Sequence, residues 1–153
     1  MSEHKATIDW KLQSPDFLKG NYSREHTWIF DGGARMQASP SPSVVPIPFS
    51  NPALIDPEEA FVASVSSCHM LTFLYLASRK GFIVDAYRDD AVGLMAKNEH
   101  GSSWISAITL HPVISYGGSK SPSPEEEQQL HHAAHEQCFI ANSIKTIVTV
   151  NHS

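Results

Sequence analysis

Two cysteines are the side chains of this sequence best suited to redox chemistry. Cys68 lies in a mostly apolar stretch, residues 56–81, and Cys138 lies near the C-terminal end of the chain. Cysteine attacks as the thiolate, and apolar surroundings raise the pKa of a thiol instead of lowering it. A nucleophilic Cys68 would therefore need an activating group from another part of the molecule. The simpler interpretation is that both cysteines are small core side chains.

An arginine is the natural activator, because its guanidinium group is always charged and offers several donors. Cys68 lies too far from the start of its predicted helix to feel the helix dipole, which fades within one turn. The adjacent His69 would point about 100° away on a helix and would not pair with Cys68. The N-terminal candidates are Arg24, in a polar turn, and Arg35, in a predicted hairpin, and the residues alone leave both open.

Residues 56–81 predict one long helix. Asp56 suits the N-cap, Pro57 suits the first helical position, and Glu59 follows at the capping-box position. Gly81 can adopt the left-handed conformation that ends a helix. Because apolar side chains surround nearly the whole helix, we expect it to be buried on most of its faces.

A membrane-spanning helix is the alternative interpretation of this stretch, since its length would suffice. A span through lipid prefers a continuous apolar surface. Polar side chains interrupt the apolar run at five positions, Ser64, Ser66, Ser67, His69 and Thr72. We therefore expect the core helix of a soluble domain and no membrane contact.

Glu58 is a second candidate for the site. Because Glu59 holds the capping-box position, Glu58 is available for a role beyond its favourable interaction with the helix dipole. Ten residues of helix place Glu58 about 15 Å from Cys68, so one chain cannot bring the two together. Two copies packed antiparallel about a twofold axis could do so, and an apolar helix suits such an interface.

The histidines raise the question of a metal. His131, His135 and Cys138 share one helical face if the helix continues that far, which is compatible with zinc or copper. Their spacing matches no closed four-ligand motif, and a solvated polar helix face is the commoner explanation of such residues. We therefore predict no metal.

The remaining elements predict an α+β fold with an antiparallel sheet, in a single domain covering residues 1–153. Alternation of apolar and polar residues predicts half-buried strands, and proline excludes regular structure from one long loop. The predicted elements are a β-meander at 5–12, 26–30 and 34–38; a loop at 39–52; the long central helix; a β-hairpin of 83–95 and 104–116; helices from 123 to about 137 and at 138–144; and a final strand at 145–150.

Composition narrows the function classes. The formal net charge is -5, so there is no basic surface for nucleic acid or anionic lipid. No apolar leader segment is visible, and two cysteines without one indicate a reducing compartment. We expect a cytoplasmic protein in which a cysteine pair is redox-active more often than structural.

Two stretches resemble the OsmC/Ohr family, named for osmotically inducible protein C and the organic hydroperoxide resistance protein. Residues 51–70 contain Pro-Glu-Glu, a helical run and Cys68, and residues 134–145 contain a helix, Cys138 and a short helix before the last strand. The predicted order of elements also fits the family. Phe139 stands where the family commonly has proline, and His69 after Cys68 is also unusual. The resemblance is therefore to a less characterised branch.

The resemblance implies a cysteine-based peroxidase that reduces organic hydroperoxides, and possible activity on hydrogen peroxide, in oxidative stress defence. Cys68 matches the family's peroxide-reacting cysteine and Cys138 its resolving cysteine. Glu58 matches the glutamate that holds the activating arginine, and Arg24 best matches that arginine. The family forms an intertwined homodimer with active sites at the interface, which agrees with the helix-length argument for Glu58.

The same resemblance implies that no bound cofactor is needed, since an external dithiol such as a lipoylated protein reduces the disulfide. By residue type, we expect an apolar channel for the organic part of the peroxide, lined by Phe61, Met70, Phe73 and Phe139. One alternative is an OsmC-fold protein that binds a small molecule or metal without efficient peroxidase turnover. Another is a dimeric structural protein whose cysteines only fill the core.

Overall fold

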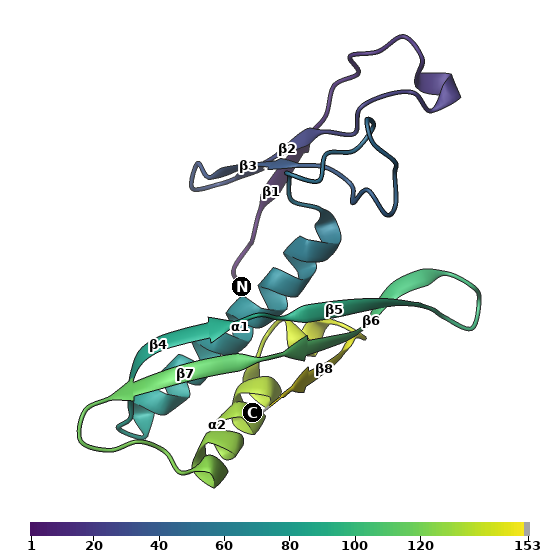
Figure 1. Ribbon diagram of the computed structural model, residues 1–153. Coiled ribbons are helices and arrows are strands. Elements are labelled where there is room, and N and C mark those ends of the chain that lie inside the picture. The colour runs from purple at the N-terminus through teal and green to yellow at the C-terminus, as the bar shows by residue number, and fades with distance from the viewer. Residues whose placement is uncertain (152–153) are drawn as a thin grey trace. The chain divides into compact units, whose positions relative to one another are not determined.

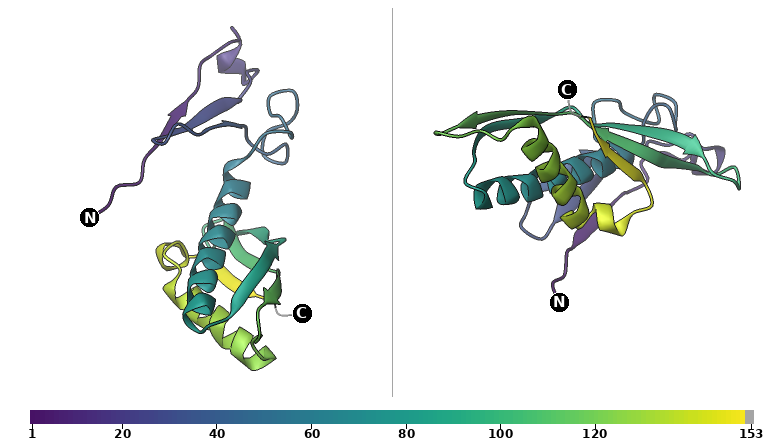
Figure 2. Two further views of the ribbon diagram at one scale, coloured as in Figure 1. Left: turned by 90° about the vertical axis from the view of Figure 1, so that its left-hand side faces the viewer. Right: turned by 90° about the horizontal axis from the view of Figure 1, so that it is seen from below.

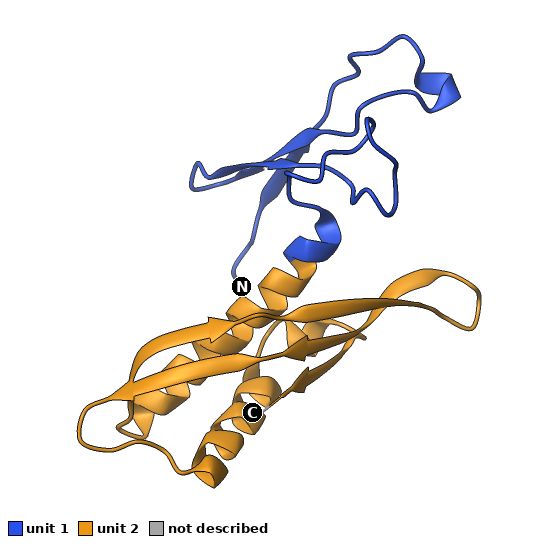
Figure 3. Ribbon diagram, in the orientation of Figure 1, with its two compact units in different colours: residues 1–60 blue, residues 61–153 orange. Residues whose placement is uncertain are grey.

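The computed structural model describes residues 1–151 and divides the chain into two compact units, Met1–Ala60 and Phe61–Ser153 (Figure 3). Helix α1, Pro57–Arg79, begins at the end of the first unit and continues through the second. The two units are described separately below. The predicted α+β class is confirmed, with helices and antiparallel strand pairs in the expected order.

The first unit is a β-meander. It contains β1, Ala6–Asp9, and the strands β2, His26–Phe30, and β3, Arg35–Ala38, which pair antiparallel in the order β1-β2-β3. A short 3-10 helix, η1, Phe17–Lys19, lies between β1 and β2. Strand β1 is shorter than predicted and exposed along its whole length, so the prediction that it is half-buried is wrong for the single chain.

The loop at 39–52 is irregular but ordered, as proline content predicts. Its ends are tied to the meander by hydrogen bonds. The backbone N–H of Asn51 donates to Ser39 Oγ at 2.8 Å, and its side-chain amide donates to Glu25 Oε1 at 2.6 Å. The N–H of Arg24 donates to the carbonyl of Phe49 at 3.0 Å. These bonds hold the loop against the segment that carries Arg24.

Helix α1 begins and ends as its sequence predicts. The N–H of Glu59 donates to Asp56 Oδ1 at 2.7 Å, and the N–H of Asp56 donates to Glu59 Oε1 at 3.2 Å, which forms a capping box. At the other end Gly81 has φ 82° and donates to the carbonyl of Ser78 at 3.0 Å. Phe82 donates to the carbonyl of Ala77, which completes a Schellman motif.

The prediction that α1 is buried on most faces is wrong for the single chain. Its buried residues form one stripe at four-residue spacing, Val65, His69, Phe73 and Ala77. Both helices of the second unit lie on the same face of its strands, so the far side of α1 stays open (Figure 2). On that side Leu71 is 60% exposed and Tyr75 is 61% exposed.

By length and composition alone, α1 is apolar enough to cross a membrane. The core helix of a soluble domain passes the same test. The buried stripe of α1 contributes to both hydrophobic clusters of the second unit, through Val65 in one and through Phe73 and Ala77 in the other. This packing accounts for the apolar residues of the buried stripe.

The long predicted hairpin is split into two pairs of strands. The strands of the second unit are β4, Ile83–Asp89; β5, Val92–Lys97; β6, Ser103–Leu110; β7, Pro112–Gly117; and β8, Ile147–Val150 (Figure 1). β4 pairs with β7, whereas β5 pairs with β6. The single strands predicted at 83–95 and 104–116 are therefore wrong at their midpoints.

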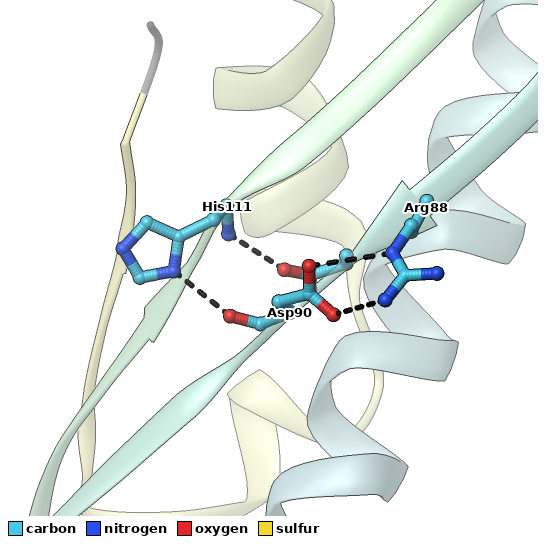
Figure 4. Close-up of polar contacts among 4 residues, drawn as sticks. Arg88, Asp90 and His111 are labelled. Carbon is cyan, nitrogen blue, oxygen red and sulfur yellow. Dashed lines mark hydrogen bonds and ion pairs between the residues drawn. The ribbon is translucent and has the colours of Figure 1, made fainter.

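Side chains at the break explain the split. Asp89 accepts the backbone N–H of His111 at 2.6 Å through Oδ1 and the hydroxyl of Ser66 at 2.5 Å through Oδ2. His111 Nδ1 lies 3.0 Å from the carbonyl oxygen of Asp90, and Arg88 forms an ion pair with the Asp90 carboxylate at 3.1 Å (Figure 4). These side-chain bonds replace ladder bonds where both strands are interrupted.

The last strand runs parallel to its neighbour. β8 pairs with β6 in parallel register, from Ala107 opposite Ile147 to Leu110 opposite Val150. The predicted purely antiparallel sheet is therefore wrong at this edge. A parallel neighbour needs a long crossover, which here includes helix α2, Pro124–Gln137, and a second 3-10 helix, η2, Ala141–Ser143.

Two hydrophobic clusters hold the second unit together. The first contains Phe73, Ala77, Phe82, Leu130 and Ala134, and the second contains Val65, Ile108 and Leu110. Close packing at the second cluster requires a glycine in β5. A Cβ atom on Gly93 would lie 2.6 Å from Val62 Cγ2, which is too close for any side chain without a shift.

Candidate active site

Cys68 lies on the open side of α1, in a groove of about 830 Å³ formed within the second unit. Its side chain is partly exposed, unlike the four fully buried residues of the same helix. The groove surface is mostly apolar, and it is lined by Ser64, Ser67, Cys68, Leu71, Thr72, Tyr75, Gln137, Phe139 and Asn142. A thiol in this position can meet a small molecule from solvent.

Cys138 caps the C-terminus of α2 and is almost completely buried, with 1% of its surface exposed. Its Sγ accepts the backbone N–H of Ala141 at 3.5 Å. Burial raises the pKa of the Cys138 thiol, and hydrogen bonding and charge from the neighbouring Cys68 raise this pKa further. The thiols of Cys68 and Cys138 are thus close enough to interact, and both are free.

This arrangement assigns different chemistry to the two thiols. Cys138 is the buried partner, and its raised pKa keeps it protonated at neutral pH. As a protonated thiol it can donate a hydrogen bond to Cys68, which faces the groove. A thiol open to a ligand with a second thiol in reserve is the arrangement needed for oxidation followed by disulfide closure.

Arg24 is held in place by its own loop. Its Nη1 donates to the carbonyls of Gly20 at 2.8 Å and Tyr22 at 2.6 Å. The guanidinium carbon lies 3.6 Å from the centroid of the Tyr22 ring, a cation–π contact. The Tyr22 ring packs in turn on Phe17, with centroids 4.6 Å apart. The first unit therefore presents an ordered cation with two donors fixed and others free to point elsewhere.

Glu58 is half-buried on the first turn of α1, and Arg35 lies on the exposed strand β3. Among residues 1–151 no ion pair joins Glu58 to Arg24 within one chain. Glu58 and Cys68 lie ten residues apart on the continuous helix α1. The bidentate pair between Glu58 and Arg24 thus stays a prediction for an assembly of two copies.

The predicted substrate channel is only partly reproduced. Phe139 lines the groove and is 83% exposed. Phe73 is fully buried in the first hydrophobic cluster, so its assignment to the channel is wrong. Phe61 packs against the second cluster, and Met70 is half-buried and not among the groove residues. Sequence missed Leu71 and Tyr75, although positions 64, 67, 68, 71 and 75 share one helical face.

The histidines of α2 do not form one solvated face. His132 is exposed and lies 3.2 Å from Glu136, but His131 is only 2% exposed, so the solvated-face prediction is wrong for it. His131 Nδ1 lies 3.0 Å from Nε2 of the equally buried His69. Within residues 1–151 no three His, Cys, Asp or Glu side chains are grouped to hold a metal ion.

The fold agrees with comparisons to known proteins. A family model described as OsmC-like protein matches residues 51–153, and the chain belongs to this family. It is 47% identical to an OsmC-like protein of unknown function from Vibrio cholerae, with 99% of each chain covered and a TM-score of 0.96. No functionally curated protein is matched by the chain.

More distant structures share the fold. An organic hydroperoxide resistance protein from Elizabethkingia anophelis is 19% identical, with 100% of this chain and 98% of that chain covered and a TM-score of 0.72. The organic hydroperoxide resistance protein OhrB of Bacillus subtilis is 18% identical, with 98% and 96% covered and a TM-score of 0.62. At such identities the likeness establishes the OsmC fold and leaves the activity to the site itself.

Proposed function

We propose that this protein is a thiol-dependent peroxidase that reduces organic hydroperoxides. The observation that carries the proposal is the interaction of the buried Cys138 thiol with Cys68, which lines an open groove. Membership of the OsmC-like family supports it, as do the names of distant structural relatives that confer hydroperoxide resistance. In a cytoplasm kept reducing, both cysteines would start the cycle as thiols.

The reaction proceeds in three balanced steps. The Cys68 thiolate attacks the distal oxygen of the hydroperoxide, and the O–O bond breaks. Cys68 becomes a sulfenic acid, and the alkoxide takes up a proton and departs as an alcohol. The Cys138 thiol then condenses with the sulfenic acid, an S–S bond forms, and water leaves. An external dithiol finally reduces this disulfide by exchange and is itself oxidised to a disulfide.

The groove favours an organic peroxide over hydrogen peroxide. Its volume of about 830 Å³ lies in the range of small-molecule sites. Leu71, Tyr75 and Phe139 offer exposed apolar surface beside Cys68, which would contact the organic part of the substrate. Ser67 and Asn142 contribute polar groups to its lining.

Activation of Cys68 would come from Arg24 of a second copy in a homodimer. Such an assembly would cover exposed apolar side chains on α1 and on the strands. They include Leu71, Tyr75, Ile83, Val92, Leu94, Val113 and Ile147. Glu58 of that same second copy would orient the guanidinium by a bidentate pair, because Glu58 of the first copy lies too far along α1 from Cys68. A monomer in sedimentation at micromolar concentration would refute the homodimer.

Mass spectrometry after one equivalent of cumene hydroperoxide tests the peroxidase proposal. Wild type should yield a Cys68–Cys138 disulfide and one equivalent of alcohol. Cys138→Ser should stop at the Cys68 sulfenic acid, trapped by dimedone. Cys68→Ser should consume no peroxide, and undiminished peroxide consumption by this variant would overturn the proposal.

A further inference from the structure

A buried pair of imidazoles joins the two helices that carry the cysteines. His69 follows Cys68 on α1, and His131 lies two helical turns before Cys138 on α2. Their ring nitrogens, His69 Nε2 and His131 Nδ1, are 3.0 Å apart. The two rings are nearly parallel, at 7°, and their side chains are 1% and 2% exposed. The proposed reaction uses neither imidazole.

The interaction between the two imidazoles depends on their orientation, whereas the surrounding apolar contacts do not. Hydrophobic packing fixes distance but allows helices to slide, whereas a hydrogen bond weakens steeply when its angle changes. A second ring of α1, Phe73, contacts the same imidazole, with centroids of Phe73 and His131 4.4 Å apart. His131 is therefore held by two side chains of α1 that are one turn apart.

The length of α2 between His131 and Cys138 means that a small rotation at the histidine pair displaces the Cys138 thiol. Seven residues of helix separate His131 from Cys138, a distance of about 10.5 Å along the axis. A rotation of α2 by about 6° around His131 would move Cys138 by about 1 Å. Disulfide closure tolerates little such movement, because it requires an S–S bond of about 2.05 Å and a narrow range of Cα separations.

We propose that the His69–His131 pair is a positioning device that keeps Cys138 within bonding reach of Cys68. The inference rests on the proposed redox partnership of the two cysteines and names residues that govern its second step. The imidazoles act through the helices and touch neither peroxide nor reductant. Removing the pair should leave the groove thiol in place and lower the tendency of the two thiols to join.

Equilibration with glutathione measures this tendency without any peroxide. Each closure converts two protein thiols and one glutathione disulfide into one protein disulfide and two glutathione thiols. The equilibrium constant is obtained by acid quenching and mass spectrometry. In the double variant His69→Leu/His131→Leu both partners become apolar and similar in size, a change that often leaves stability nearly unaltered.

We expect the double variant to keep its melting temperature and to lower the equilibrium constant by about tenfold or more, as a displacement near 1 Å would. The matched control is His132→Leu, which removes the exposed neighbouring imidazole and should equal wild type. An equilibrium constant within about twofold of wild type in the folded double variant would overturn the inference. The inference would also be overturned if wild type formed no Cys68–Cys138 disulfide after equilibration with the glutathione couple.

A second pair of variants decides the matter if the double variant fails to fold. Replacing His69 by Gln places an amide near the position of Nε2, whereas replacing it by Asn leaves the amide too short to reach His131. Wild-type closure in His69→Gln with about tenfold weaker closure in His69→Asn supports the positioning role. Equal values overturn it. Failure of the peroxidase proposal would instead appear as Cys68 that resists hydroperoxide while glutathione closure remains normal.

Discussion

The two units differ in how many of their side chains are buried. Residues 1–60 bury only Ala38, Ser39, Ser50 and Asp56 among their side chains. The second unit has two hydrophobic clusters and both cysteines. The thiol pair therefore lies in the part of the chain with its own core, whereas the candidate activating groups, Arg24 and Glu58, lie in the part without one.

This difference indicates that another protein surface covers the exposed apolar side chains of the first unit. Three short strands without a covered face are not independently stable. Ile8 is 60% exposed and Leu18 is 99% exposed within the single chain. The proposed homodimer would cover such residues and bring an arginine to the thiol in the same event. Stability of the first unit and activation of Cys68 would then depend on one interface.

The largest expected effect tests the contrast in burial. Phe73→Ala removes a ring from the first cluster and should lower the free energy of unfolding by about 3–5 kcal/mol. Ile8→Ala should cost about 1–2 kcal/mol if a second copy covers β1. Denaturant titration at two protein concentrations measures both. A cost below about 0.5 kcal/mol for Ile8→Ala would show that this strand stays exposed in solution.

The next effect concerns the activating cation. Arg24→Ala should slow oxidation of Cys68 by tert-butyl hydroperoxide about 100-fold, as loss of one fixed electrostatic contact often does. Stopped-flow measurement of thiol loss gives this rate. Arg35→Ala is the matched control, because Arg35 is also in the first unit but lies on exposed β3. A slow Arg35→Ala with a normal Arg24→Ala would transfer the role to Arg35.

The pH dependence of disulfide closure follows from the environment of Cys138. Burial and the neighbouring Cys68 raise the pKa of its thiol, so the thiolate is scarce at neutral pH. Because only the thiolate attacks, closure should accelerate about tenfold per pH unit between about pH 6 and pH 8. Rapid quenching and mass spectrometry follow the decay of the Cys68 sulfenic acid. A flat profile would contradict the expectation that the raised pKa of Cys138 limits closure.

Local chemistry made several parts of the fold predictable. Capping residues act within four positions of each other, so Asp56 and Ser123 marked the helix starts correctly. The split of the hairpin was missed because Asp89 finds its partners, Ser66 and His111, only after tertiary folding. The parallel pairing of β8 likewise depends on a crossover whose path no local pattern reveals.

The site was predictable to the extent that residue type alone defines its chemistry. Cys68 and Cys138 were identified by type and family resemblance, and the fold places them together. Residue type misled for Phe73, because an aromatic ring suits a channel and a core equally well. The buried role of His69 could have been found from its four-residue spacing to Phe73, whereas that of His131 required the packed helices.

The two units also differ in the capping residue at the start of their helices, α1 and α2. Both have capping boxes, with Asp56 and Glu59 in the first unit and Ser123 and Glu126 in the second. A side-chain hydrogen bond to the Asp56 carboxyl raises the pKa of Glu59. At the other helix, the backbone N–H of Ser123 lowers the pKa of Glu126. A carboxyl cap and a hydroxyl cap thus shift the partner glutamate in opposite directions.

Exchanging the caps should exchange these shifts. In Asp56→Ser the second carboxyl is gone while the backbone donor remains, so the pKa of Glu59 should fall below its ordinary value; Ser123→Asp should raise that of Glu126. In wild type, the raised pKa of Glu59 stabilises the fold in acid, and this stabilisation is lost as pH rises through the folded pKa. In Asp56→Ser, Glu59 would instead stabilise the fold above its unfolded pKa, and this stabilisation would be lost as pH falls through the lowered folded pKa. Carboxyl carbon chemical shifts titrated by NMR measure both values. If neither pKa moves after the exchange, the units' surroundings, and not their caps, set the two values.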